Sequence, residues 1–243
     1  MSSFRYITAE EEGFKGSFFD RLLAAGFYRM QHIMFTCNET VINQEGTSVP
    51  VFWLRTLVQQ CRLSSSAAII NKKCNRFSVN IQKAYVDDEV ETLYALYKDH
   101  VQFRATETCS NYLHMPVIPL PFNSMMIQVR DGDALIAVGY FDKGKTAISG
   151  IMNMYHPHYK QYSLGKFLML KKLQYALQQN MIFYYTGYIS TENTRFDYKL
   201  FPDAQAVEVL LPVDQQWLPY HLLNKSFLAA YYAKFLQESK EAL

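Results

Sequence analysis

The order of secondary-structure patterns over residues 134–188 constrains the fold of this chain more than any other feature. The first part predicts a β-hairpin, because two apolar, β-prone segments flank the turn-forming residues Asp142-Lys143-Gly144-Lys145. Ser163 is a typical N-cap residue, and the apolar side chains after it recur at helical spacing over residues 164–178. Residues 181–188 then predict a third strand. The free amides at the start of such a helix can bind a phosphate or an acyl oxygen.

The remaining chain supplies further strands and helices around this unit. We expect strands over residues 27–36, 49–57, 76–82 and 206–211, and helices over residues 87–103 and 224–241. The first two of these strands predict a hairpin with a long loop. The fold class that follows is α+β, with a mixed, mainly antiparallel sheet and flanking helices. This order is similar to the GNAT-like (acyl-CoA N-acyltransferase-like) core, in which the helix after a central strand receives the ligand.

Composition argues against several classes of protein. The 24 Lys and Arg against 22 Asp and Glu give a formal net charge of +2, which is too small to indicate nucleic-acid binding by itself. The four cysteines form no C-x-x-C pair, so neither a zinc nor an iron–sulfur site is predicted, and no other cofactor is expected. The sequence has neither a leader pattern nor an apolar run of the roughly 20 residues that span a bilayer. We therefore expect a cytoplasmic protein without a membrane partner, and the oligomeric state stays open.

Six short motifs follow one another in the second half of the chain. They are Tyr155-His156-Pro157-His158, Ser163-Leu164-Gly165, Tyr175-Ala176, Tyr184-Tyr185-Thr186-Gly187-Tyr188-Ile189, Tyr198-Lys199 and Phe201-Pro202. Together they resemble the C-terminal half of the aminoacyl-tRNA–protein transferases, the arginyl-transferases and bacterial leucyl-transferases of the N-degron pathway. The first half is fainter: residues 22–29 (LLAAGFYR) resemble the family's L-L-x-x-G-F-R-R, and residues 49–51 (VPV) resemble its V-P-V-R.

A proline-rich, loop-like segment over residues 104–121 marks the main seam in the chain. We expect two regions on either side of it. Residues 1–115 form an N-terminal, transferase-like α+β region, and residues 116–243 form a GNAT-like catalytic domain.

The resemblance implies an enzyme that moves an arginyl or leucyl group from charged tRNA to the N-terminal amine of an acceptor protein or peptide. Such aminolysis needs a positioned amine, a proton acceptor and a group that stabilises an oxyanion. Carried onto this sequence, the family motifs give three candidate catalytic residues, His156, Tyr188 and Tyr198. They also give six candidate substrate-binding residues, Ser163, Leu164, Gly165, Lys166, Tyr185 and Lys199. No residue is assigned to a metal.

The chain departs from the family pattern at three places. The family carries a cysteine cluster between its first two strands, and here only Cys37 stands in that segment. The arginines of its S-R-S-Q-R-R motif are replaced by Ser65, Ala67 and Ala68, and each lost arginine is a lost phosphate contact. The acidic residue before the proline of Y-D-P is replaced by His156.

Two other functions stay open. One is a GNAT-type N-acyltransferase that uses acyl-CoA, although residues 161–165 (QYSLG) lack the second glycine of the usual R/Q-x-x-G-x-G/A motif. The other is a non-catalytic protein that retains the fold. Each candidate residue also has an ordinary structural role open to it: the histidines lie in a loop, the tyrosines suit a core, and Lys160, Lys166, Lys171 and Lys172 suit a solvated basic helix face.

Overall fold

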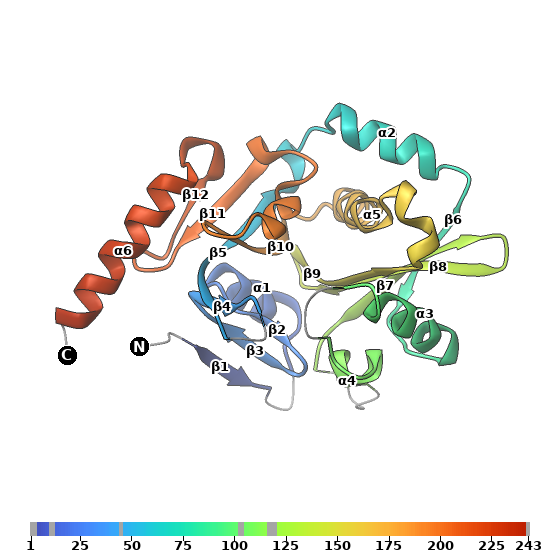
Figure 1. Ribbon diagram of the computed structural model, residues 1–243, viewed down its shortest axis with the longest axis horizontal. Helices are drawn as coiled ribbons and strands as arrows, with labels where there is room; N and C mark the ends of the chain where they lie inside the picture. The colour runs from blue at the N-terminus through green and yellow to red at the C-terminus, as the bar shows by residue number, and fades with distance from the viewer. Residues whose placement is uncertain (1–3, 10–12, 44–45, 102–104, 116–120, 242–243) are drawn as a thin grey trace.

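The computed structural model of this protein describes residues 4–9, 13–43, 46–101, 105–115 and 121–241 (Figure 1). Within them, most strands join one nine-stranded sheet. Its order is β12 (Gln216–Pro219), β11 (Val207–Leu211), β5 (Ser48–Leu57), β10 (Phe183–Ser190), β9 (Ala147–Tyr155), β8 (Ala134–Lys143), β7 (Ser124–Asp131) and β6 (Ser78–Lys83), with β4 (Glu39–Val41) paired to β5. A smaller sheet has the order β1 (Arg5–Thr8), β3 (Ile33–Thr36) and β2 (Tyr28–Met30).

Neighbouring strands of the large sheet are antiparallel, apart from the parallel pair β9–β10. Parallel neighbours need a crossover connection, and helix α5 (Leu164–Gln178) supplies it. The elements from β6 to β10 therefore run strand, helices, three-stranded meander, helix and strand. This confirms the predicted α+β class, the mainly antiparallel sheet and the GNAT-like core.

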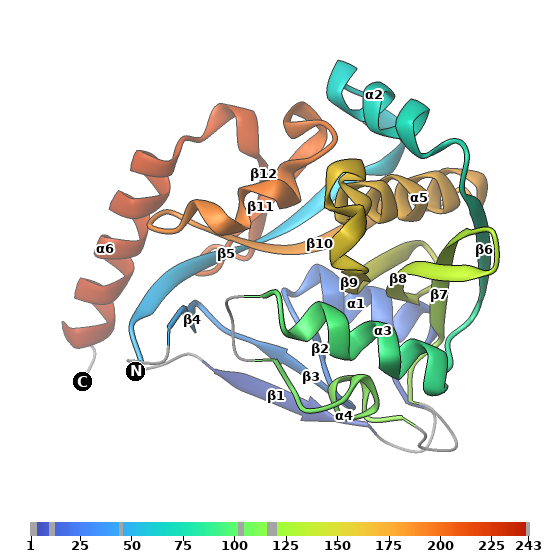
Figure 2. The same cartoon turned by 45° about the vertical axis from the view of Figure 1, so that its right-hand side comes forward.

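Helices cover both faces of the sheet (Figures 1 and 2). Helices α2 (Ser65–Cys74) and α5 lie on one face, and α1 (Gly16–Ala24), α3 (Asp88–Lys98) and α4 (Cys109–Leu113) lie on the other. Short 3₁₀ helices connect these elements: η1 (Val58–Gln60), η2 (Pro157–Tyr162), η3 (Thr194–Leu200), η4 (Ala204–Ala206) and η5 (Tyr220–Leu222).

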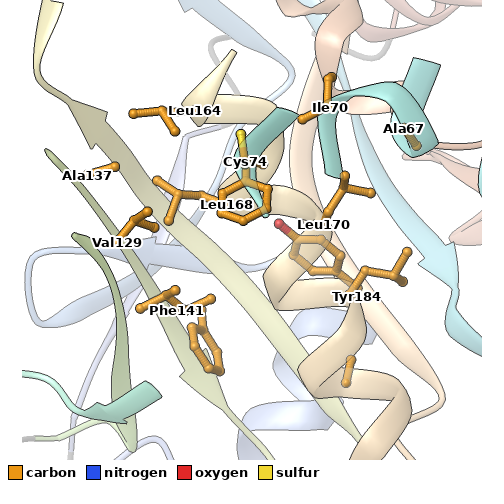
Figure 3. Close-up of a cluster of buried hydrophobic side chains, with 14 of the residues drawn as sticks. Ala67, Ile70, Cys74, Val129, Ala137, Phe141, Leu164, Leu168, Leu170 and Tyr184 are labelled. Atoms are coloured by element: carbon orange, nitrogen blue, oxygen red, sulfur yellow. The ribbon is translucent and has the colours of Figure 1, made fainter. Parts of the chain in front are cut away.

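The core between α2, α5 and the sheet holds α5 in place. Leu164 and Leu168 of α5 share one buried cluster with Cys74 of α2 and with Ala137 and Phe141 of β8 (Figure 3). Burying aliphatic and aromatic side chains like these stabilises a fold by about 1.5–3 kcal/mol each. The cluster therefore fixes the start of α5 against the sheet.

The predicted hairpin between residues 27–36 and 49–57 is wrong. Residues 28–36 form their own hairpin, β2–β3, because Gln31 adopts a left-handed conformation (φ 55°) that turns the chain. Strand β5 instead lies between β10 and β11. Its buried run from Val49 to Leu54 fits a strand covered on both faces rather than one edge of a hairpin.

The predicted helix over residues 87–103 is shorter than expected and ends at Lys98. The predicted seam between residues 115 and 116 borders residues 116–120, which lie outside the described part of the chain. Strands β5 and β6 of the predicted N-terminal region share the large sheet with β7–β12.

The C-terminal helix α6 (Lys225–Glu241) packs beside β11 through Leu228 and Tyr232. Its Lys225 forms an ion pair with Asp197 at 2.8 Å. In the described part of the chain, no helix combines the length and apolarity that crossing a membrane requires.

Gly144, in the β8–β9 turn, leaves no room for a side chain. A Cβ at this position would overlap Asp20 Oδ1 and lie 3.3 Å from the carbonyl oxygen of Ala147. Asp20 has little freedom to move away, because its Oδ2 accepts hydrogen bonds from the amides of Lys145 and Thr146 at 3.1 and 2.8 Å.

We therefore expect Gly144→Ala to lower the free energy of unfolding by about 1–3 kcal/mol, the usual cost of overpacking. Urea denaturation measures it. Gly165→Ala is the matched control, since its new Cβ would lie 3.6 Å from Tyr155 Cε1, an ordinary contact. Equal stability of the two variants would contradict the steric explanation.

Candidate active site

Strands β9 and β10 pair over a short length and then part. Residues 183–185 of β10 pair with residues 147–149 of β9, and the longer remainder of each strand is unpaired with the other. Irregularities on both strands lie at this point. The register of β10 shifts between Tyr185 and Gly187, and Ile151 of β9 has no partner in β8. The strands therefore diverge in front of the N-terminus of α5, the helix that the GNAT-like order assigns to the ligand.

Lys199, in η3, lies against the part of β10 that is not paired with β9. Its Nζ donates a hydrogen bond to the carbonyl oxygen of Tyr188 at 3.1 Å. It also lies 4.2, 4.8 and 5.8 Å from the ring centroids of Tyr188, Phe196 and Tyr198. None of the ion pairs among the described residues includes Lys199. Burial lowers its pKa to about 7.

Gly187 makes this close approach possible. A Cβ there would lie 3.2 Å from both Cε and Nζ of Lys199, and the positive φ of Gly187 (107°) is unfavourable for other residues. The backbone of η3 is anchored to the same strand, because Thr186 Oγ1 donates to the carbonyl oxygen of Lys199 at 3.1 Å. The ammonium group is therefore held in place without a carboxylate partner.

Three of the predicted site residues, Tyr188, Tyr198 and Lys199, come together here. The Tyr188 hydroxyl lies 3.2 Å from Thr40 Oγ1, and its ring contacts Trp53 edge to face at 5.1 Å. Tyr198 is 48% exposed as a whole residue, but burial raises the pKa of its hydroxyl, which therefore faces the group around Lys199.

Further tyrosines from distant segments surround the same region. Burial raises the pKa of Tyr97 of α3 and of Tyr184 of β10, and in both cases the next cause is proximity to Tyr198. Burial and proximity to Tyr188 raise the pKa of Tyr112 of α4 to about 12. The hydroxyls of Tyr97, Tyr112 and Tyr184 form no hydrogen bond with another described residue. Tyr184 is 2% exposed and belongs to the core under α5, whereas Tyr97 and Tyr112 are partly exposed.

Sequence reasoning missed Tyr112 because residues 104–121 read as a loop. The structure places helix α4 there, capped by Thr108, whose side chain accepts a hydrogen bond from the amide of Asn111. That cap motif is the one local signal that indicates a helix in the segment.

The start of α5 differs from the prediction at Ser163. Its side chain makes no capping hydrogen bond, because Ser163 also ends η2 and adopts a left-handed conformation (φ 54°) instead of the extended one of an N-cap. Its amide donates to the carbonyl oxygen of Lys160 at 3.1 Å. The next amides, those of Leu164 and Gly165, donate to no other described residue. The backbone here therefore still offers donors to an anion.

The side chains of the same turn have different environments. Leu164 is fully buried in the core (Figure 3), so only its backbone can contact a substrate. Lys166 is exposed and lies 5.3 Å from the ring centroid of Phe201, two residues beyond Lys199. This contact links the first turn of α5 to the η3 segment.

His156 and Tyr185 make their contacts with other residues. His156 Nδ1 accepts a hydrogen bond from the amide of His158 at 3.2 Å, and burial lowers the pKa of His156. Tyr185 is 1% exposed and packs edge to face on Tyr28 and Trp217 at 6.0 and 5.7 Å. Within the described residues, no hydrogen bond or ring contact joins either of them to Lys199.

The family's cysteine cluster does not fit this chain. Cys37 is buried, and burial raises its thiol pKa to about 11, which disfavours the thiolate that binds metals. No group of three His, Cys, Asp or Glu among the described residues is placed to hold a metal ion.

The place of Lys172 on the helix suits a solvated basic face, but the structure buries this side chain. It is 1% exposed, and its Nζ donates to the carbonyl oxygens of Tyr140 and Met152 at 2.7 and 3.2 Å and to Asn153 Oδ1 at 2.7 Å. Tyr140 and Met152 are the last aligned pair before the unpaired Ile151. Lys172 therefore holds the irregular segment of β9 at the strand divergence.

We expect Lys172→Met to change how stability depends on pH. Burial lowers the pKa of Lys172 to about 7 in the folded protein, whereas an unfolded lysine titrates near 10.4. Between these values the unfolded chain binds more protons, so raising the pH favours the folded state by up to about 1.4 kcal/mol per unit. Chemical denaturation of both proteins between about pH 7 and 9 should show wild type gaining stability relative to the variant. A difference in the free energy of unfolding that stays constant over this pH range would contradict the lowered pKa of Lys172.

Sequence comparisons agree with this geometry. The family described as "Arginine-tRNA-protein transferase, C terminus" matches residues 89–206. A protein of Shewanella sp. (strain ANA-3) named aspartate/glutamate leucyltransferase is 25% identical over 205 residues, which is 79% of each chain. One of the same name from Teredinibacter turnerae is 31% identical over 85 residues, 35% of this chain and 33% of that one.

Among solved structures, a C-terminal DUF2156 domain from Agrobacterium fabrum aligns with a TM-score of 0.44 at 11% identity. The match covers 57% of this chain and 46% of that one. The GNAT-like assignment rests instead on the strand order and the single parallel pair. The sequence match over residues 89–206 includes α3, α4, the β7–β9 meander, α5, β10 and η3, and so Lys199 and the three aromatic residues around it. The chain is thus similar to the aminoacyl-tRNA–protein transferases, over residues 89–206 to the family's C-terminal part and at 25% identity over most of its length to a leucyltransferase.

Proposed function

We propose that this protein transfers an aminoacyl group from charged tRNA to the α-amine of a protein N-terminus. The amine nitrogen attacks the ester carbonyl carbon, so a C–N bond forms while the C–O bond to the terminal ribose breaks. The amine proton ends on the departing ribose oxygen. The ester is already activated, so positioning and charge stabilisation suffice and no covalent intermediate is needed.

Lys199 is the observation that carries this proposal. A cation enclosed by three aromatic rings, without a carboxylate of its own, suits a carboxylate brought by the substrate. The named relatives act on aspartate and glutamate, and an acidic N-terminal side chain would supply that carboxylate. We therefore propose N-terminal Asp or Glu as the acceptor and leucine, with arginine as the second choice, as the donor.

The other site residues take roles that follow from their places. Tyr188 and Tyr198 border Lys199, and in this proposal their hydroxyls orient the acceptor amine. The free amides of Leu164 and Gly165 stabilise the oxyanion or bind the terminal nucleotide, with Ser163 and Lys166 beside them. Roles for His156 and Tyr185 stay predictions.

The cellular setting is part of the proposal. Charged tRNA and its protein acceptor meet in the cytoplasm. The four free cysteines, three of them buried, fit a reducing compartment.

The test is transfer of labelled amino acid. The protein is incubated with tRNA charged with labelled leucine or arginine and with peptides beginning with Asp, Glu, Arg or Lys. We expect label on the Asp and Glu peptides and none on N-acetylated copies. An absence of label on every peptide would contradict the proposal. A thermal shift and acyl transfer with acetyl-CoA would also contradict it and would favour an acyl-CoA enzyme.

A further inference from the structure

Acidic residues are absent from two long segments of the chain. Residues 46–86 and 143–191 together contain twelve Lys or Arg and neither Asp nor Glu. The remaining residues hold the other twelve Lys or Arg and all 22 Asp and Glu. The small net charge of the whole chain therefore conceals a strong separation of positive from negative charge.

The fold brings the helices of these two segments together on one side of the sheet. Helix α2 of the first segment lies over α5 of the second (Figures 1 and 2). Lys171 Nζ lies 3.4 Å from Asn71 Oδ1, and Cys74 Sγ lies 3.5 Å from the carbonyl oxygen of Tyr162. The ring of Phe77 contacts that of Tyr162 at 4.9 Å. Helix α2 of the first segment and η2 with α5 of the second therefore form one surface.

This surface exposes its positive charge. Six exposed basic side chains belong to α2, η2, the first turn of α5 and the residues beside α2: Arg62, Lys72, Lys73, Arg76, Lys160 and Lys166. We call them the basic face. Two carboxylates lie at its border: Asp131 pairs with Arg76 at 3.1 Å, and Asp203 accepts from the backbone amide of Arg62 at 2.8 Å. The four lysines have no ion pair among the described residues.

We infer that the basic face binds the phosphate backbone of the RNA whose charged end enters the proposed active site. Lys166 belongs to both, because it lies in the first turn of α5 and contacts Phe201 next to η3. A strand of phosphates crossing α2 and η2 would therefore lead to the free amides of α5. This inference rests on the proposed function for the identity of the RNA. The basic face would also supply phosphate contacts in place of the missing arginines of the family's S-R-S-Q-R-R motif.

Binding of uncharged tRNA tests it without requiring catalysis. Fluorescence anisotropy gives the affinity of wild type and of Lys72→Gln/Lys73→Gln/Lys160→Gln over a range of salt. If each lysine contacts a phosphate, the slope of log K against log salt should fall in size by about 2–3 in the variant. Its circular dichroism and melting temperature should match wild type, because the three side chains are exposed.

The control removes exposed lysines from the α1 side of the molecule. Lys15→Gln/Lys145→Gln should keep the wild-type salt slope, since Lys15 precedes α1 and the amide of Lys145 bonds to Asp20 of α1. An unchanged slope in the triple variant, or equal losses in both variants, would overturn the inference. So would tighter binding of anionic phospholipid vesicles or of a poly-glutamate peptide than of tRNA. If tRNA binding depends on the basic face but no transfer occurs, the proposed function fails and the binding of RNA phosphates by the basic face stands.

Discussion

Replacing Arg29 by methionine should lower the free energy of unfolding by about 3–5 kcal/mol, the usual cost of stripping a buried charge of its partner. Arg29 and Asp142 form an ion pair at 3.0 Å whose side chains are 3% and 1% exposed. Arg29 also donates to Ser124 Oγ at 2.8 Å and to the carbonyl oxygen of Leu113 at 2.7 Å. Its guanidinium carbon lies 4.4 Å from the ring centroid of Phe122. One side chain thus ties β2 to β7, β8 and the end of α4.

The pH dependence separates this explanation from general loss of packing. Burial raises the pKa of Asp142, and Arg29 opposes that shift. Without Arg29 the folded-state pKa rises further, so stability is lost as the pH increases from the unfolded value near 3.9 to the new folded value. The difference in the free energy of unfolding between Arg29→Met and wild type should therefore be smaller in acid and larger towards neutral pH. A variant within about 1 kcal/mol of wild type at neutral pH would contradict the role of the pair.

Replacing Lys199 by methionine should reduce kcat/KM for transfer to an Asp-terminal peptide by about 10²–10³-fold, while the protein stays folded. Methionine keeps the apolar stem packed against Tyr188 and Phe196 and removes only the charge. Circular dichroism and the melting temperature check the fold, and initial rates against peptide concentration separate KM from kcat. Lys225→Met is the matched control, since it removes a nearby lysine whose partly exposed ion pair with Asp197 contributes about 0–1 kcal/mol.

The lowered pKa of Lys199 also predicts that binding of the acceptor peptide depends on pH. Its pKa of about 7 means that the cationic form, which pairs with an acidic substrate, is lost as the pH rises through that value. KM for an Asp-terminal peptide should therefore rise above about pH 7, and KM for an Asn-terminal peptide should not. Parallel profiles for the two peptides, or an active Lys199→Met, would show that Lys199 does not bind the acceptor.

The sequence predicted the local parts of the fold well, because local patterns specify them. The alternating apolar residues and the turn at 142–145 gave the β8–β9 hairpin, and the helical spacing after Ser163 gave α5. Contacts between distant segments could not be read in this way. The place of β5 between β10 and β11 depends on pairing across more than a hundred residues, and no local pattern records it.

The candidate site shows the same division. Motif order led to Tyr188, Tyr198 and Lys199, and the fold places them side by side. The motif order did not indicate that Leu164 and Tyr185 face the core, because the direction of a side chain depends on which face of its helix or strand is covered. The burial of Lys172 was equally hidden, since a lysine on a helix is ordinarily solvated and only the irregular segment of β9 gives this one its acceptors.

One measurement tests aminoacyl transfer at this site most directly. A single turnover of leucyl-tRNA with an Asp-terminal peptide is stopped, and the peptide is sequenced by tandem mass spectrometry. We predict that the peptide gains one leucyl residue on its α-nitrogen with the wild-type protein and with Lys225→Met, and not with Lys199→Met. A folded protein that binds tRNA and leaves the peptide unmodified by either leucyl- or arginyl-tRNA would contradict aminoacyl transfer by this chain.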